Sequence, residues 1–301
     1  MAERKILIAG GGTGGHLFPA LAIGEEIHRR EPNAMIHYVG SNFGLEARVF
    51  PVKDVWHTLL PIRGFQRGLS LQSLGRNMLL PTRIIRSMLK LRSLLLDFLP
   101  EVVVGTGGYA SALPLYMASR KAEPLPIILQ EQNSFPGVTT RWFAEKAKTI
   151  CIAFKEANDY LERETVLTGN PIRQGIENGL RENAEKEFNL NPDHQTIFLF
   201  GGSQGSAYLN KMMNKVVNNI AGTGLQVLWQ TGDLEYLKYK NQDSDNIRVI
   251  PFIHNMADAY ALSDLIICRS GALTLAEVTV CGKPSILVPF PAATADHQSK
   301  N

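Results

Sequence analysis

Short apolar runs alternate along this chain with longer stretches in which apolar residues recur at helical spacing. This alternation is typical of parallel β-sheets that are covered by helices on both faces. The expected strands are residues 6–9, 35–39, 56–60, 102–104, 127–130 and 149–153 in the first half, and 196–200, 226–229, 247–250, 265–268 and 285–288 in the second. The pattern therefore predicts an α/β protein with two sheets.

The strongest breakers of regular structure lie between the two sets of strands, from residue 167 to residue 192. Glycine and proline interrupt helices and strands, so this stretch is the expected hinge. A chain of 301 residues usually forms two cores. We predict an N-terminal Rossmann-like domain over residues 1–164 and a C-terminal one over residues 165–301, and we expect the second to be incomplete, because it stops just after a turn.

Three glycine-rich turns directly follow expected strands. Residues 10–16 read GGGTGGH, residues 105–111 read GTGGYAS and residues 201–206 read GGSQGS. A turn of this kind points free backbone N–H groups and the positive end of a helix dipole at an anion. Because such turns occur in both halves, we expect the chain to hold two phosphorylated molecules.

The first turn also matches the dinucleotide-binding fingerprint, with glycines at 10, 12 and 15. That fingerprint requires an acidic residue after the second strand to bind a ribose hydroxyl. Here the second strand ends in Gly40-Ser41-Asn42, without an acid at that point. The sequence therefore argues against a nicotinamide-dependent dehydrogenase.

Composition narrows the class of protein further. A formal net charge of +3 is too small to indicate nucleic-acid binding. The three cysteines are far apart and lie in apolar runs, which favours buried reduced thiols over a metal site or disulfide. We find no signal peptide, and no uncharged apolar run approaches the ~18 residues of a transmembrane helix.

The stretch from residue 62 to residue 100 is rich in leucine and basic residues, and Asp97 is its single acid. Pro81 suits the first turn of a helix, which we expect over residues 82–97. Its apolar content exceeds one stripe and its polar positions are cationic. Such a helix either packs in the core with its arginines in water or rests on an anionic membrane, and the charge asymmetry favours the membrane.

Five motifs of the chain resemble those of the MurG family. They are residues 11–16 (GGTGGH), 131–133 (EQN), 169–173 (GNPIR), 201–205 (GGSQG) and 269–277 (RSGALTLAE), in the family's order. Members of this family are membrane-associated N-acetylglucosaminyltransferases that convert lipid I to lipid II in peptidoglycan synthesis, and so act in cell wall biogenesis, cell shape and cell division.

The resemblance implies a GT-B fold, with two Rossmann-like domains facing across a cleft. The lipid-linked acceptor is expected on the first domain and UDP-N-acetylglucosamine mainly on the second. The resemblance also implies a peripheral enzyme at the cytoplasmic face of the cell membrane, with other cell-wall synthesis enzymes as candidate partners. No cofactor and no metal ion are expected, because backbone N–H groups, helix dipoles and Arg173 can stabilise the departing diphosphate.

The matching motifs also assign residues. Ser203 is expected at the UDP phosphates, Glu277 at the ribose hydroxyls and the backbone of Ile253 at the uracil. The expected UDP-N-acetylglucosamine site comprises Thr13, Gly14, Gly15, Asn133, Arg173, Ser203, Ile253, Ala272, Leu273, Thr274, Glu277 and Gln298. The expected acceptor-diphosphate site comprises Gly12, Gly107, Gly108 and Tyr109.

His16 is the candidate for assisting proton removal when the acceptor's C4 hydroxyl displaces UDP with inversion. Gln130 stands where some family members have His, so no catalytic task is assigned to it. Two alternatives stay open at this point: another lipid-directed GT-B glycosyltransferase, for example one acting on diacylglycerol, and a non-catalytic truncated scaffold at the membrane. Retention of His16, Ser203 and Glu277 argues against the scaffold.

Overall fold

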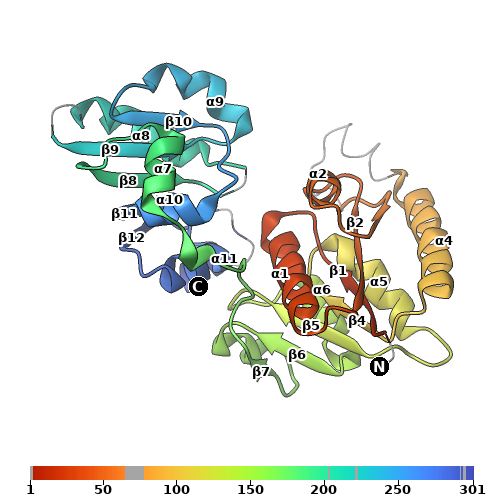
Figure 1. Cartoon of the computed structure of the whole chain (residues 1–301). Coiled ribbons are helices and arrows are strands. Elements are labelled where there is room, and N and C mark those ends of the chain that lie inside the picture. Colours follow the sequence, from red (N-terminus) through yellow and green to blue (C-terminus); the bar gives the residue numbers. More distant parts are fainter. Residues whose placement is uncertain (1–2, 65–77, 203, 221–222, 292, 294–295) are drawn as a thin grey trace. The chain divides into compact units, whose positions relative to one another are not determined.

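The computed structural model describes residues 3–64, 78–202, 204–220, 223–291, 293 and 296–301, and the chain divides into two compact units (Figure 1). The first unit is Met1–Arg173 and the second is Gln174–Asn301. The division falls after Arg173, whereas the sequence pattern placed it after residue 164. The stretch between includes a short strand, β7 (Val166–Leu167), which pairs with β6 (Thr149–Ile152) and so belongs to the first sheet.

The first unit is built on a seven-stranded parallel sheet in the order β3-β2-β1-β4-β5-β6-β7. Its strands are β1 (Lys5–Ala9), β2 (Met35–Ser41), β3 (His57–Leu60), β4 (Val102–Gly105), β5 (Ile127–Glu131), β6 (Thr149–Ile152) and β7. The strand order reverses between β1 and β4, and in such sheets the ligand crevice lies beyond the carboxyl ends of the strands at that point. Two of the glycine turns follow these two strands.

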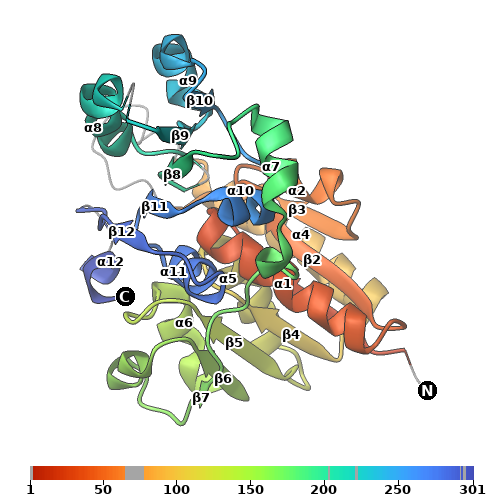
Figure 2. The same ribbon diagram turned by 60° about the vertical axis from the view of Figure 1, so that its left-hand side comes forward.

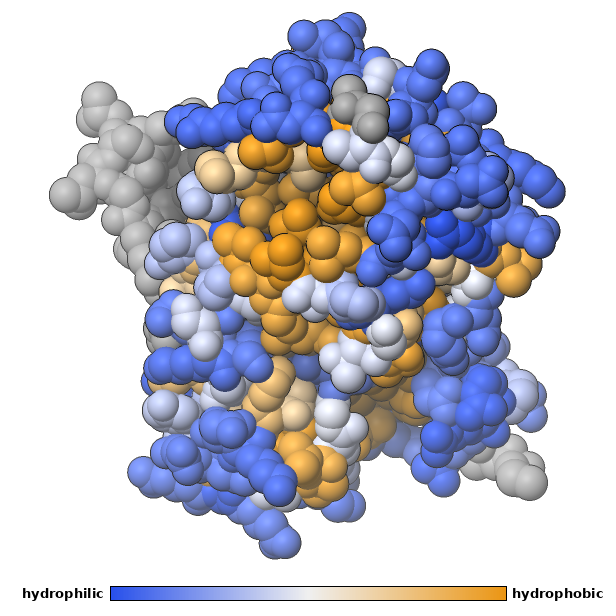
Figure 3. All heavy atoms as spheres, turned by 90° about the vertical axis from the view of Figure 1, so that its left-hand side faces the viewer, coloured by the Kyte–Doolittle hydropathy of each residue, from blue (hydrophilic) through white to orange (hydrophobic). Residues whose placement is uncertain are grey.

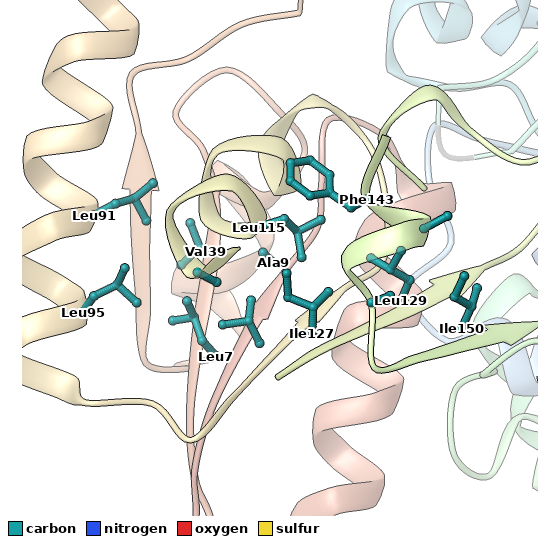
Figure 4. Close-up of a cluster of buried hydrophobic side chains, with 14 of the residues drawn as sticks. Leu7, Ala9, Val39, Leu91, Leu95, Leu115, Ile127, Leu129, Phe143 and Ile150 are labelled. Atoms are coloured by element: carbon teal, nitrogen blue, oxygen red, sulfur yellow. The ribbon is translucent and has the colours of Figure 1, made fainter. Parts of the chain in front are cut away.

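Helices cover both faces of the first sheet (Figure 1). They are α1 (Gly14–Arg30), α2 (Glu46–Val52), α4 (Leu80–Phe98), α5 (Tyr109–Ser119) and α6 (Val138–Phe143), with the short 3-10 helices η1 (Ala144–Lys146) and η2 (Lys155–Tyr160). Side chains alternate across β1, so Leu7 belongs to one core cluster with Leu91 of α4 and Leu115 of α5 (Figure 4). Ile8 packs on the opposite face in a second cluster with Leu17 of α1.

The second unit has a five-stranded parallel sheet in the order β10-β9-β8-β11-β12 (Figure 2). Its strands are β8 (Gln195–Phe200), β9 (Leu225–Gln230), β10 (Ile247–Ile250), β11 (Leu265–Cys268) and β12 (Ser285–Leu287). Its helices are α7 (Arg181–Phe188), α8 (Ala207–Val216), α9 (Asp233–Tyr239), α10 (Met256–Leu262), α11 (Ala272–Val280) and α12 (His297–Lys300), with η3 (Ile176–Asn178), η4 (Val217–Asn219) and η5 (Lys240–Gln242). The order reverses between β8 and β11, which places the third glycine turn at the second switch point.

The strands expected from the sequence are all present, within a residue or two of the expected ends. The two-residue strand β7 was not expected, because it is short and both of its side chains are exposed. The predicted hinge stretch contains one α-helix, α7, which ends at Phe188 and is followed by Asn189 in the left-handed conformation, three residues before Pro192. The breakers therefore mark the ends of this helix.

Helix α4 confirms the expectation of a helix over residues 82–97, with Pro81 in its first turn. Ser87, Leu91, Leu95 and Phe98 are buried, and Leu91 and Leu95 point toward the sheet in Figure 4. Ile85, Leu89 and Leu96 are 58%, 63% and 62% exposed on the other side of the helix. One face of α4 thus packs into the core, while a second apolar stripe remains exposed.

None of the helices within the described ranges has the length and hydropathy that crossing a membrane requires. Apolar side chains also gather on the face drawn in Figure 3, with polar ones around them. Cys268 is buried, which raises the pKa of its thiol to about 12, whereas Cys151 and Cys281 are half-buried. The expectation of buried cysteines therefore holds for Cys268, while Cys151 and Cys281 are more exposed than expected.

Candidate active site

The first glycine turn connects β1 to α1 and needs glycine for two reasons. Gly12 has φ +93°, a conformation that side chains rarely adopt. A Cβ atom on Gly12 would also lie 2.7 Å from Cε1 of Tyr109, the first residue of α5. The ring of Tyr109 therefore packs on the turn, and its hydroxyl lies 3.4 Å from Oγ of Ser41.

Glu46, at the start of α2, fixes this turn through hydrogen bonds to its carboxylate. Its carboxylate is fully buried and accepts hydrogen bonds from the N–H of Gly12 at 3.1 and 2.9 Å and from the N–H of Ser41 at 2.8 Å. The Gly12 N–H that the sequence assigned to the acceptor diphosphate thus donates to a protein carboxylate here. The N–H groups of Thr13, Gly14 and Gly15 make no hydrogen bond to another described residue.

His16 lies in the first turn of α1, and its ring is held by residues that follow β4 and β5. Nδ1 is 3.0 Å from the carbonyl oxygen of Thr106 and 3.0 Å from Oε1 of Gln132. A Cβ atom on Gly107 would lie 2.9 Å from Nδ1, and one on Gly108 would lie 3.0 Å from Cδ2. These two glycines, predicted at the acceptor diphosphate, therefore provide the flat surface on which the imidazole rests.

Asn133 and Arg173 complete the predicted residues of the first unit. The N–H of Asn133 donates to the buried carboxylate of Glu131 at 3.1 Å, and Glu131 also accepts from Thr140 Oγ1 at 2.6 Å. The guanidinium of Arg173 lies 5.5 Å from the ring centroid of Phe18, two residues beyond His16. The loops after β1, β4 and β5 thus meet around His16, at one edge of the sheet.

The glycine turn of the second unit connects β8 to α8. Gly202 and Gly205 have φ +89° and +76°, so both require glycine. Ser206 caps α8 by accepting a hydrogen bond from the N–H of Leu209. Ser203, the residue expected at the UDP phosphates, lies outside the described residues.

Arg269, at the end of β11, adds a cation that the sequence did not assign. Its guanidinium donates to Ser206 Oγ at 2.9 Å and to the carbonyls of Val288 and Pro289 at 3.1 and 2.8 Å. Only 9% of the residue is exposed, and burial lowers its pKa from the ordinary arginine value. A positive charge is therefore fixed beside the turn and the start of α8. Its place in the RSGALTLAE motif was the signal that could have found it.

The residues expected at the sugar and nucleoside lie on two further elements. Ala272, Leu273 and Thr274 form the first turn of α11. Glu277 lies one turn further along, is 7% exposed and accepts a hydrogen bond from the hydroxyl of Tyr260 at 3.0 Å. This contact with α10 fixes the direction of the carboxylate.

Gln230, at the end of β9, joins the expected uracil loop to the glycine turn. Its Oε1 accepts the N–H of Ile253 at 2.9 Å, and its Nε2 donates to the carbonyl of Gly202 at 3.2 Å. The backbone N–H of Ile253 is thus occupied, while no described residue donates to its carbonyl. A polar residue at the end of a buried strand, next to the strand before the turn, was the available signal for Gln230.

Gln298, the last expected sugar contact, accepts hydrogen bonds through both its side chain and its backbone. Its Oε1 accepts the N–H of Phe290 at 2.9 Å, and its carbonyl accepts from Ser270 Oγ at 2.6 Å. Gln298 is therefore fixed against the loop that precedes α11, near Ala272.

An Asp-x-Asp sequence, of the kind that holds a divalent ion in some glycosyltransferases, occurs at Asp243-Ser244-Asp245. Asp243 accepts from Arg248 Nη1 at 2.7 Å and from the N–H of Val249 at 2.8 Å, so its carboxylate is bound to the middle of β10. Within the described ranges, no three His, Cys, Asp or Glu residues form a group that could hold a metal ion.

Comparisons with known families and structures match both units. Residues 6–152 match the glycosyltransferase family 28 N-terminal domain, and residues 196–301 match the family 28 C-terminal domain. The chain is 38% identical over 99% of its length to a UDP-N-acetylglucosamine--N-acetylmuramyl-(pentapeptide) pyrophosphoryl-undecaprenol N-acetylglucosamine transferase of Christiangramia forsetii, of which it covers 80%. It is 39% identical over 99% of its length to the protein of the same name in Chlorobaculum tepidum, of which it covers 82%.

Two solved structures agree with these matches. The crystal structure of Acinetobacter baumannii MurG superposes with a TM-score of 0.67 at 25% identity, covering 99% of this chain and 82% of that one. Os79 from O. sativa, solved with U2F and trichothecene, superposes with a TM-score of 0.70 at 12% identity, covering 99% of this chain and 83% of that one, and this likeness shows the fold alone.

Proposed function

The chain belongs to glycosyltransferase family 28 and has the GT-B fold, and from that premise we propose that it converts lipid I to lipid II. The reaction transfers N-acetylglucosamine from UDP-N-acetylglucosamine to the C4 hydroxyl of the N-acetylmuramoyl unit of undecaprenyl-diphospho-muramoylpentapeptide. The observation that carries this proposal is near-full-length similarity, at 38% and 39% identity, to two relatives named for that one reaction.

The second unit supplies groups that suit the UDP-sugar. Glu277 can accept both ribose hydroxyls, and Tyr260 fixes its carboxylate in place. The free carbonyl of Ile253 can accept the N3–H of uracil, because Gln230 already occupies the N–H. The Gly201–Ser206 turn and the start of α8 suit the diphosphate, where Arg269 adds positive charge.

The first unit supplies groups that suit the acceptor, and we assign to the acceptor Thr13, Gly14, Gly15 and Arg173, which the resemblance had placed at UDP-N-acetylglucosamine. The N–H groups of Thr13, Gly14 and Gly15 form the N-terminal turn of α1, which has no acidic side chain in its first turn. A diphosphate oxygen is stabilised by such N–H groups and by the helix dipole. Tyr109, Gly107 and Gly108 border the same turn, and Arg173 lies over Phe18 of α1.

The chemistry is a direct displacement at the anomeric carbon. The C4 oxygen of the acceptor forms a bond to C1 of the sugar while the bond from C1 to the UDP oxygen breaks, so the configuration at C1 inverts. His16 takes the hydroxyl proton. The negative charge that develops on UDP is stabilised by the N–H groups of the turn, the dipole of α8 and Arg269.

We also propose that α4 places the enzyme on the cytoplasmic face of the membrane that holds its acceptor. Ile85, Leu89 and Leu96 recur at spacings of four and seven residues on the exposed side of the helix. Arg86, Lys90 and Arg92 are exposed among them. Cations near an anionic leaflet contribute about 1 kcal/mol each, and the apolar stripe adds the burial that a peripheral helix needs.

The choice of acceptor tests the proposed conversion of lipid I to lipid II. The chain is incubated with labelled UDP-N-acetylglucosamine and either a lipid I analogue or diacylglycerol in detergent micelles. We expect labelled product with the lipid I analogue only. Labelled diacylglycerol would instead support the alternative lipid-directed glycosyltransferase, and UDP binding without product from either acceptor would contradict the proposed reaction.

A further inference from the structure

We propose that Gln132 is a positioning residue that fixes His16 in the tautomer with hydrogen on Nδ1. The lone pair of the imidazole then lies on Nε2, where it can accept the proton of the acceptor hydroxyl. The inference deepens the proposed function. It rests on that function for one point, that the proton comes from the hydroxyl of the acceptor sugar.

Nδ1 of His16 is surrounded by acceptors. It lies 3.0 Å from the carbonyl oxygen of Thr106, which has no hydrogen to donate, and 3.0 Å from Oε1 of Gln132. A neutral imidazole has one nitrogen that donates and one that accepts. With two oxygens facing Nδ1, the hydrogen must be on that nitrogen.

The orientation of the Gln132 amide follows from its other contacts. Its Nε2 lies 2.8 Å from the carbonyl oxygen of Thr106, 3.1 Å from the carbonyl oxygen of Gln130 and within hydrogen-bond distance of Oε1 of Gln130, so its two hydrogens are shared among three acceptors. All three partners are acceptors, so the amide nitrogen must face them and the amide oxygen must face His16. Gln130, which received no task from the sequence, therefore orients Gln132.

The network continues away from the imidazole through a further amide. Gln130 Nε2 lies 3.4 Å from Oδ1 of Asn170, and Asn170 Nδ2 donates to the carbonyl of Gln132 at 3.1 Å. Gln130 and Gln132 are 3% and 2% exposed, so water does not compete for these bonds. A buried network with satisfied partners holds one arrangement firmly.

Nε2 of His16 is the nitrogen left for chemistry. No described residue forms a hydrogen bond with it. The ring is half-buried and rests on Gly107 and Gly108, where a Cβ atom would come within 3.0 Å of it. Second partners that set the tautomer of a functional histidine are a general device of protein sites.

Nitrogen-15 NMR of the histidine rings in the full chain tests this inference directly. His16 is assigned by the loss of its signals in His16→Ala. We expect a protonated Nδ1 and an unprotonated Nε2 in the neutral ring of the wild type. Gln132→Met removes one of the two acceptors at Nδ1 and also the amide that donates to the other, the Thr106 carbonyl. We therefore expect mixed tautomers and at least a tenfold lower kcat, with less than a twofold change in KM for UDP-N-acetylglucosamine. Gln132→Glu keeps an oxygen that can face Nδ1 but loses the donor to the carbonyls of Thr106 and Gln130, so we expect it to restore the Nδ1–H tautomer and only part of kcat.

Gln226→Met is the matched control. Gln226 is also a fully buried amide, but it joins Asn191 and Thr196 in the second unit. We expect this variant to lower thermal stability without moving the His16 signals. Hydrogen on Nε2 in the wild type, or an unchanged tautomer in a folded Gln132→Met, would overturn the inference. Nδ1–H that depends on Gln132 in a chain that transfers no sugar would support the positioning role and overturn the proposed function.

Discussion

Single residues in the first unit show how the glycine turn acquires its shape. The glycines were visible in the sequence, because their spacing alone predicts a turn. Glu46 was not, since it lies 34 residues from Gly12 and only the folded sheet brings the two together. A Cβ atom on Gly11, Gly40 or Gly44 would lie 2.5 Å or less from a side-chain atom of Glu46. Only glycine therefore leaves room for the Glu46 side chain at these three positions.

Glu46→Gln tests this arrangement. The carboxylate accepts N–H groups with both oxygens, whereas glutamine would turn an NH₂ group toward at least one N–H donor. We expect the free energy of unfolding to fall by about 1–3 kcal/mol, the cost of an unsatisfied buried group. Urea unfolding measures this change, with the exposed Glu123→Gln as control. Equal stability of the two variants would contradict the role given to Glu46.

At the scale of elements, α4 packs against the first sheet through a cluster of aromatic rings around His37. The ring of His37 on β2 lies 5.7 Å from that of Trp56 and 5.4 Å from that of Phe98, the last residue of α4. Burial, with a smaller contribution from His57, lowers the pKa of His37 from 6.5 to about 4. The folded protein thus holds this ring neutral where an unfolded chain protonates it.

Stability should therefore fall with acid in a defined window. Between pH 6.5 and about 4, His37 is protonated in the unfolded chain and neutral in the folded protein. The contribution of His37 to the free energy of unfolding is therefore most favourable above pH 6.5 and is lost as the pH falls to about 4. The loss is at most about 3 kcal/mol. In urea titrations at about pH 7 and pH 5, His37→Gln should flatten this dependence, whereas the exposed His28→Gln should leave it intact. A wild-type slope that survives in His37→Gln would exclude His37 as its source.

The exposed stripe of α4 carries the membrane proposal. Replacing Ile85 and Leu89 with serine removes apolar area from the exposed face and leaves the buried Leu91 and Leu95 untouched. We expect at least a fivefold loss of binding to vesicles rich in anionic lipid, measured by sedimentation. Leu234→Ser on α9, where the side chain is 93% exposed, is the control. Binding that survives the double substitution would place the membrane surface elsewhere.

The sequence predicted the strands and helices well, but it did not predict the contacts that join separate loops. Buried parallel strands such as residues 102–104 and 196–200 are continuous apolar runs, and these are readable locally. Arg269, Gln230 and Glu46 act by joining separate loops, and the partner of each is set by strand order. The resemblance supplied motifs but not these links, so Arg269 and Gln230 emerged only with the fold.

At the scale of the whole molecule, each unit has its own sheet and core, with two glycine turns in the first unit and one in the second. UDP should therefore protect the second unit selectively. At ~100 times its dissociation constant, UDP adds about 2.7 kcal/mol to stability. Hydrogen exchange should slow in the Gly201–Ser206 turn and the first turn of α11, and Glu277→Gln should reduce this effect at fixed UDP while Glu187→Gln should not. Protection confined to the first unit would contradict the assignment of the donor.

The central claim is that this chain joins N-acetylglucosamine to the acceptor sugar in one inverting step. The most direct measurement is to isolate the product formed from UDP-N-acetylglucosamine and a lipid I analogue and to determine its linkage by NMR. The account predicts a β-linked N-acetylglucosamine on the C4 oxygen of the muramoyl unit, with one UDP released per linkage. An α linkage, a different hydroxyl, or release of free sugar in place of transfer would contradict it.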